Sequence, residues 1–146
     1  NVRNGNLRAE IEATVPEKVN GVVFAMGGYA GGVSLYALDG DLYYEYSALL
    51  LKRDKIKVGA LPAGDVTIAY EMRTPMERAS PAELTFWING KEAAKGTVRR
   101  TLPLLFTASE TFDVGMDTAS PVAEDYFDKA PFKFEGTLKR LHFKYL

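Results

Sequence analysis

The chain contains no cysteine, one histidine and one tryptophan among its 146 residues. The lack of cysteine excludes disulfides, thiolate metal sites, cysteine nucleophiles and any nucleophile produced by modifying a cysteine. The 18 basic and 19 acidic residues nearly cancel, leaving a net charge of −1. A chain without a basic excess lacks the electrostatic footprint of nucleic-acid-binding proteins, so we expect no nucleic-acid partner.

Long apolar runs are also missing. No stretch approaches the ~20 consecutive apolar residues of a membrane-spanning helix, so we expect no membrane span. The chain begins at Asn1 without a charged-then-apolar leader, so it shows no signal peptide, and the sequence does not assign a compartment. The length fits one domain, and few mature proteins begin in this way. We therefore interpret residues 1–146 as a single domain that is a fragment or processed product of a longer protein.

Apolar and polar residues alternate along much of the chain, the period-2 pattern of half-buried strands. The pattern is clearest at residues 7–15 and 66–72. Turn residues separate the runs, and Asp39-Gly40 and Asn89-Gly90 are typical of two-residue hairpin turns. These features predict about ten to twelve short strands and no helix. The expected fold is all-β, an antiparallel β-sandwich of two sheets.

Two patterns narrow this fold class further. In the hairpin FWINGKE at residues 86–92, alternation turns Trp87 to the opposite side of its strand from Phe86 and Ile88. The closing strand reads Phe134-x-Gly136-x-Leu138-x-x-Leu141-x-Phe143, with one break in its alternation. Together they resemble the hairpin and final strand of concanavalin-like and laminin-G-like jelly rolls. That resemblance implies a jelly-roll sandwich.

A closer similarity extends over residues 21–143. Its segments are GVVFAMGG at 21–28, GGVSLY at 31–36, LPAG at 61–64, VRRTLP at 98–103, ETFDVGMDT at 110–118 and SPVAEDY at 120–126. In order and spacing they resemble the C-terminal domain that follows the catalytic domain of bacterial arylsulfatases. The resemblance implies a non-catalytic accessory domain that supports the catalytic sulfatase domain of the same polypeptide or mediates assembly. Homo-oligomerisation through exposed edge strands stays open.

The family's catalytic motif, Cys/Ser-x-Pro-x-Arg, is absent from this chain. A formylglycine, a divalent cation and several basic groups cannot be assembled from His142 and scattered lysines. His142 also alternates with apolar neighbours, so we expect it on the surface. By itself the chain is expected not to be an enzyme, although the parent protein would be a hydrolase. The alternative is a free-standing carbohydrate-binding or adhesive jelly-roll module.

Three aspartates are candidate ligands for Ca²⁺. Asp113, Asp117 and Asp125 lie in an acidic segment and offer the hard oxygen atoms that calcium prefers. Their spacing fits no EF-hand, and the same residue types form turns and caps in solvated loops. Calcium therefore stays an open alternative, and no other cofactor is expected.

Trp87 and several tyrosines are candidates for ligand stacking. Trp87 with Tyr29, Tyr43, Tyr44 and Tyr46 would make a platform for a sugar ring. A second interpretation places these aromatic residues in the sheet core and in cross-strand pairs. A third interpretation, which we favour here, makes exposed Trp87 part of a surface that docks onto the catalytic domain or a second subunit.

Overall fold

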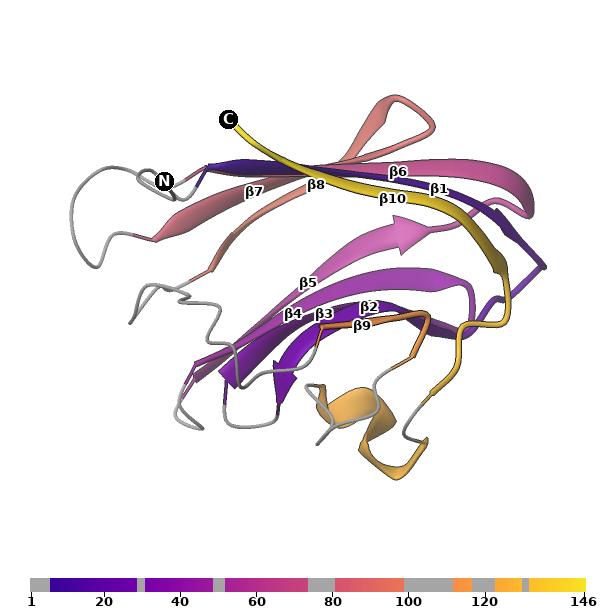
Figure 1. The fold of residues 1–146 in the computed structure, drawn as a ribbon, viewed down its shortest axis with the longest axis horizontal. Helices are drawn as coiled ribbons and strands as arrows, with labels where there is room; N and C mark the ends of the chain where they lie inside the picture. Colours follow the sequence, from indigo (N-terminus) through magenta and orange to yellow (C-terminus); the bar gives the residue numbers. More distant parts are fainter. Residues whose placement is uncertain are drawn as a thin grey trace.

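The computed structural model describes residues 6–28, 31–48, 52–73, 81–98, 112–116, 123–129 and 132–146. Ten strands and one short 3₁₀ helix account for most of these residues. The strands are β1 (Leu7–Val15), β2 (Gly21–Gly28), β3 (Gly31–Leu38), β4 (Asp41–Ala48), β5 (Lys52–Ala60), β6 (Gly64–Arg73), β7 (Ala82–Ile88), β8 (Lys91–Val98), β9 (Phe112–Val114) and β10 (Thr137–Tyr145), and the helix is η1 (Glu124–Lys129). The predicted all-β fold is confirmed (Figure 1).

The strands form two five-stranded sheets that lie face to face (Figure 1). The first sheet has the order β10-β1-β6-β7-β8, and the second has the order β5-β4-β3-β2-β9. Every pairing between these strands is antiparallel. Five pairs of sequence neighbours form hairpins: β2–β3, β3–β4, β4–β5, β6–β7 and β7–β8. In contrast, β1 pairs with β6 and β10, and β2 pairs with β9, from distant parts of the chain. This is the double-sheet arrangement of a jelly roll.

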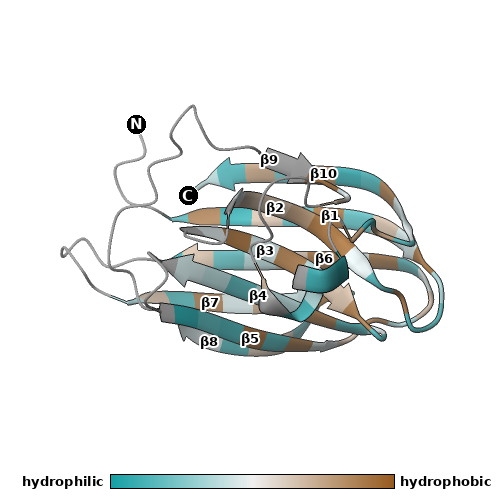
Figure 2. Cartoon of the chain, turned by 90° about the horizontal axis from the view of Figure 1, so that it is seen from below, coloured by the Kyte–Doolittle hydropathy of each residue, from teal (hydrophilic) through white to brown (hydrophobic). Residues whose placement is uncertain are grey.

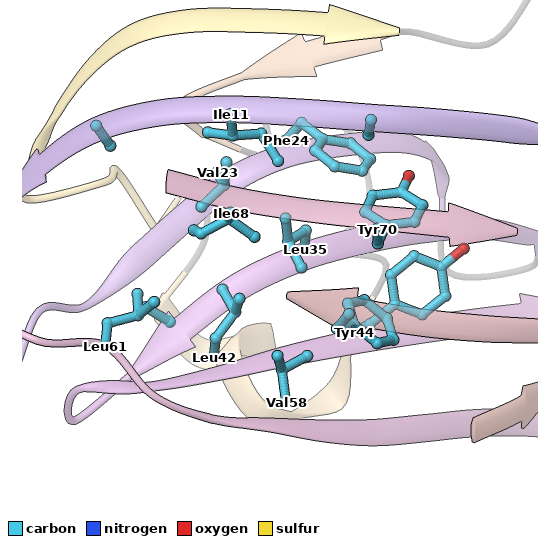
Figure 3. Packing of buried hydrophobic residues seen from close by; sticks show 14 of the residues in the cluster. Ile11, Val23, Phe24, Leu35, Leu42, Tyr44, Val58, Leu61, Ile68 and Tyr70 are labelled. Atoms are coloured by element: carbon cyan, nitrogen blue, oxygen red, sulfur yellow. The ribbon is translucent and has the colours of Figure 1, made fainter. Parts of the chain in front are cut away.

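Hydrophobic and hydrophilic residues alternate along the strands (Figure 2). The buried hydrophobic residues of both sheets form one core cluster between them. On β1 every second residue from Ala9 to Val15 is buried, with at most 3% of its surface exposed. Figure 3 shows side chains from both sheets meeting in this core. The ring of Tyr44 lies 5.4 Å from that of Tyr70 and 5.5 Å from that of Phe86, which joins the two sheets. Each large apolar side chain buried here contributes roughly 1.5–3 kcal/mol to stability.

The hairpin between β7 and β8 has the predicted turn. Asn89 and Gly90 both have positive φ, at 51° and 79°. Asn89 also ties the turn to β6, since its backbone N–H donates to the Thr67 carbonyl at 2.8 Å and its side-chain oxygen accepts from the Thr67 N–H at 2.9 Å. The loop is therefore fixed against the neighbouring strand.

The break in the closing pattern is a β-bulge between β10 and β1. Glu12 pairs with Arg140 and Ala13 with Leu138, so Lys139 has no opposite residue on β1. The extra residue keeps Leu138 and Leu141 on the inner side, where both pack against the core. His142 is exposed, as predicted.

A second, smaller core explains the continuous apolar run at residues 21–26. Helix η1 packs on the outer face of the second sheet (Figure 1). Its fully buried Tyr126 donates to the Ser34 hydroxyl at 2.8 Å and contacts the ring of Tyr36, with the centroids 5.1 Å apart. Val22 and Ala25 of β2 are buried beneath it, so β2 is covered on both faces.

A glycine-rich sequence such as that of residues 27–32 is typical of a sharply bending loop. In the structure, however, Gly27 pairs with Gly32 and Gly28 with Gly31, so these glycines extend the β2–β3 ladder. Glycine still offers a backbone donor and acceptor, so a glycine-rich sequence can continue a ladder. Within the described ranges, no helix is long and apolar enough to span a membrane.

Candidate functional site

The outer face of the first sheet carries a hollow of about 360 Å³, here called the Trp87 hollow. It is lined mainly by outward-pointing side chains of four strands: Glu10 and Glu12 of β1, Thr67 and Ala69 of β6, Trp87 of β7 and Arg140 of β10. Because β6 lies between β1 and β7, its two small side chains form the floor. The longer side chains on the flanking strands form the walls.

Strand register explains why the surface is hollow at this point. Ala69 pairs with Glu10 on one side and with Trp87 on the other. A methyl group between two long side chains leaves an open space above it. The pinned Asn89–Gly90 turn lies at the end of β7, and Gly90 also lines the hollow.

Arg8 closes one end of the hollow and contacts the indole of Trp87. The central carbon of its guanidinium lies 5.3 Å from the indole centroid, within range of a cation–π interaction. Arg8 donates from Nε to Glu10 at 2.9 Å and from Nη1 to Glu71 at 3.1 Å. Arg73 binds the other oxygen of Glu71, so four charged side chains form one chain of ion pairs. We call this chain the Arg8 network.

Ion pairing with Arg8 keeps the Glu10 carboxylate, which lines the hollow, ionised. The hydrogen bond from Arg8 is the main cause that lowers the pKa of Glu10 below its ordinary value, and nearby positive charges add to it. The same bond raises the pKa of Arg8. Glu10 therefore presents a negative charge to the hollow at neutral pH.

Two further lining groups have no hydrogen bond to other described residues. They are the Glu12 carboxylate and the Arg140 guanidinium, both exposed and paired in register across β1 and β10. A carboxylate only accepts hydrogen bonds and a guanidinium only donates them. Beside the apolar face of an indole, this set suits a ligand that is partly apolar and rich in hydroxyl groups.

The structure separates the members of the predicted aromatic platform. Trp87 does face away from Phe86 and lines the hollow. Tyr44 and Tyr46 are wrong as platform members because they are buried between the sheets. Tyr43 lies on the second sheet, where its ring stacks on Tyr36 with centroids 5.5 Å apart. Alternation shows which residues share a face of a strand, but it does not show which sheet the strand joins.

Tyr29, the remaining member, lies outside the described residues. Arg8, Glu10 and Ala69 were not predicted from the sequence as residues of a site. The outward alternation of β1 could have indicated the first two. The role of Ala69 depends on cross-strand register, for which the sequence carried no signal.

The structure places one of the three predicted calcium ligands in a different set of contacts. The Asp125 carboxylate accepts from the Tyr36 hydroxyl at 2.7 Å and from the Lys55 ammonium. Partial burial acts to raise the pKa of Asp125, but the bonds from Lys55 and Tyr36 outweigh it, and the pKa lies below its ordinary value. Among the described residues no cluster of three acidic or histidine side chains could hold a metal ion.

The calcium hypothesis is not tested at its other two positions. Asp117 lies outside the described residues, and only the backbone of Asp113 is described, within β9. Calcium binding at those two positions therefore stays an open alternative.

Comparison with solved structures agrees with the strand topology. The fold is that of the laminin-G-like jelly rolls. The LG4–5 domains of the mouse laminin alpha1 chain match with a TM-score of 0.65 at 15% identity, covering 99% of this chain and 36% of that chain. The CBM40 of the Ruminococcus gnavus IT-sialidase, bound to alpha2,3-sialyllactose, matches with a TM-score of 0.64 at 14% identity, covering 97% of this chain and 77% of that one.

A third structure is the native heptameric SAP-like pentraxin of Limulus polyphemus. Its TM-score is 0.59 at 15% identity, with 99% of this chain and 65% of that chain covered. The chain thus spans about a third of the laminin chain and about two thirds of the pentraxin. At these identities the likeness is one of fold.

No protein-family model and no curated protein sequence matches the chain. The resemblance to concanavalin-like and laminin-G-like jelly rolls is confirmed as a statement about fold. Nothing found links the chain to sulfatases, so the arylsulfatase origin stays a prediction.

Proposed function

We propose that this chain is a non-catalytic carbohydrate-binding module and that the Trp87 hollow is its binding site. The observation that carries the proposal is an indole placed beside small floor residues and charged walls. A sugar ring has an apolar C–H face that packs against an aromatic ring, and hydroxyl groups that both donate and accept hydrogen bonds. The volume of about 360 Å³ lies within the range of about 300–1,000 Å³ that is usual for small-molecule sites.

The solved structures support the proposal by analogy. One of them is a carbohydrate-binding module of the same fold solved with sialyllactose. Fold alone does not determine function, so the support for carbohydrate binding comes from the residues of the hollow. The charged walls and the single indole are observations on this chain.

Weak binding is expected for a single sugar unit. At roughly 0.3 kcal/mol per non-hydrogen atom, a hexose would contribute about 4 kcal/mol, which corresponds to a Kd of about 1 mM. Oligosaccharides or several modules acting together would strengthen the apparent affinity. Screening should therefore use multivalent display.

A glycan array, followed by calorimetry on the positive ligands, tests the proposal. Trp87→Ala should abolish binding, and Trp87→Phe should retain part of it because an aromatic face remains. Tyr145→Ala is the matched control, since Tyr145 is an aromatic residue with 63% of its surface exposed and lies outside the hollow. Absence of any glycan binding, or binding that survives Trp87→Ala, would refute the proposal.

An accessory role in an arylsulfatase would use the same face differently. In that case half-buried Trp87 and the Arg8 network would be covered by the catalytic domain. The parent gene distinguishes the two roles, because a Cys/Ser-x-Pro-x-Arg motif upstream of Asn1 is required for the second. An unrelated module upstream would contradict the arylsulfatase role, and carbohydrate binding would then be the remaining proposal.

A further inference from the structure

We propose that the sugar unit taken by the Trp87 hollow is uncharged, and that Glu12 and Arg140 together bind its hydroxyl groups. This inference rests on the proposed carbohydrate-binding function and specifies its ligand class. It follows from the charges around the hollow and from the hydrogen bonds that those charges already make.

The charges of the side chains that line the hollow are balanced. Two cations, Arg8 and Arg140, line the hollow together with two anions, Glu10 and Glu12. Arg8 already binds two carboxylates, those of Glu10 and Glu71, at 2.9 Å and 3.1 Å. Its positive charge is therefore compensated before any ligand arrives, and the four charged side chains that line the hollow sum to zero, so they provide no excess of positive charge to attract a carboxylate or sulfate.

A carboxylate on the wall of the hollow would repel an acidic sugar. Glu12 lies two residues beyond Glu10 on the same face of β1, and no cation among the described residues binds its carboxylate. An acidic sugar placed over Thr67 and Ala69 would lie beside this carboxylate, because Glu12 is the neighbour of Thr67 in register. Placing like charges side by side is a recognised source of specificity against the wrong ligand.

Glu12 and Arg140 together are complementary to a pair of hydroxyl groups. Glu12 and Arg140 are opposite each other on paired strands, so their Cβ atoms are expected about 4.5–5.5 Å apart. They form no hydrogen bond with each other in the structure. A pair of neighbouring hydroxyl groups can donate to Glu12 and accept from the fork of Arg140 at the same time. An acidic group can accept from Arg140 but has nothing to donate to Glu12.

The test uses Trp87 as the reporter, because it is the only tryptophan in the chain. Tryptophan fluorescence is followed during titration with matched neutral and acidic probes. These are the methyl glycosides of glucose, galactose and mannose, the methyl glycosides of glucuronic and galacturonic acid, and glucose 6-sulfate. We expect at least one neutral probe to bind, and its acidic counterpart to bind at least about tenfold more weakly, a difference of about 1.4 kcal/mol.

Three outcomes separate this inference from the proposed function. Neutral binding with weaker acidic binding supports both. Acidic binding that is equal or tighter overturns the ligand class while the carbohydrate-binding function stands. No response to any probe, together with a negative glycan array, overturns both.

Charge variants provide a second test. Glu12→Gln should weaken neutral binding about tenfold and narrow the gap between neutral and acidic probes, because one repelling charge is gone. Arg140→Gln should weaken neutral binding to a similar extent. Glu83→Gln is the control, since Glu83 is an exposed glutamate on the same sheet face outside the hollow. A neutral affinity unchanged in both Glu12→Gln and Arg140→Gln would overturn their role.

Discussion

Arg8 connects the indole of Trp87 to the carboxylates around it. Its side chain is 27% exposed, so solvent screens its ion pairs only in part. A single arginine here contacts an aromatic ring and two glutamates from different strands. The orientation of Trp87 thus depends on a residue that is distant in sequence.

We expect Arg8→Gln to lower the free energy of unfolding by about 1 kcal/mol, because it removes a cation–π contact and two ion pairs. The emission of Trp87 should also move to longer wavelength as the indole loses its cover. Arg73→Gln is the control at the exposed end of the network, with a side chain that is 58% exposed, and it should change stability by less than about 0.5 kcal/mol. Urea denaturation followed by fluorescence measures both. Equal losses in the two variants would contradict a special role for Arg8.

Gly21 is a second residue on which local geometry depends. Its φ is +117°, and an added Cβ would overlap the backbone of Lys133 and Phe134. Gly64 has a comparable φ of +99° but open space where a Cβ would stand. The two glycines therefore separate backbone strain from steric overlap.

Gly64→Ala is expected to cost about 1–2 kcal/mol from backbone strain alone. Gly21→Ala should cost at least about 1 kcal/mol more, since the segment before β10 must also move. Chemical denaturation of the two variants gives the difference directly. Similar losses would mean that the segment at residues 133–134 adjusts freely.

At the scale of single elements, the sequence correctly predicted the structural features that depend on one strand or one turn. The alternation of β7 placed Trp87 opposite Phe86, and the broken alternation of β10 marked a true bulge at Lys139. The positive φ of Asn89 and Gly90 was also predictable, because turn chemistry is local.

The hollow itself could not be predicted in this way. It requires Glu10, Ala69 and Trp87 to lie side by side on three strands. Their register is set by packing between residues far apart in sequence, and a shift of one residue would exchange the two faces. The separation of Tyr43 and Tyr44 from Trp87 has the same origin, because sheet membership is also a long-range property.

Helix η1 allows a test of the calcium hypothesis at the scale of an element. Asp125 is already bound by Lys55 and Tyr36, which fix the helix to the second sheet. A cation there would have to displace an ammonium group, so we expect calcium to leave the melting temperature unchanged. Thermal melting with added calcium and with a chelator measures this. A rise with calcium that the chelator reverses would show a structural site.

At the scale of the whole molecule, stability should fall in acid. Glu10, Asp65 and Asp125 all have a pKa below the ordinary value in the folded chain, which is 4.5 for glutamate and 3.8 for aspartate. A group with a lowered folded pKa stabilises the fold above its unfolded pKa, and this contribution is lost as the pH falls through the folded value. The loss should therefore begin near pH 4.5 and continue below it.

Denaturation measured between neutral and acidic pH tests this expectation. The triple variant Glu10→Gln, Asp65→Asn and Asp125→Asn should be less stable at neutral pH. Its free energy of unfolding should also depend less on pH below about 4.5. A profile as steep as that of the unchanged chain would assign the acid sensitivity to other carboxylates.

The pairing of β1 with β10 has a consequence for the making of the protein. The ribosome releases β1 more than a hundred residues before β10, yet the two strands lie side by side in the finished sheet. Until β10 emerges, β1 can pair with β6 on one side only and keeps a row of unsatisfied backbone groups on the other. During translation the nascent chain therefore presents an open edge, which makes this the stage at which a chaperone would be most useful.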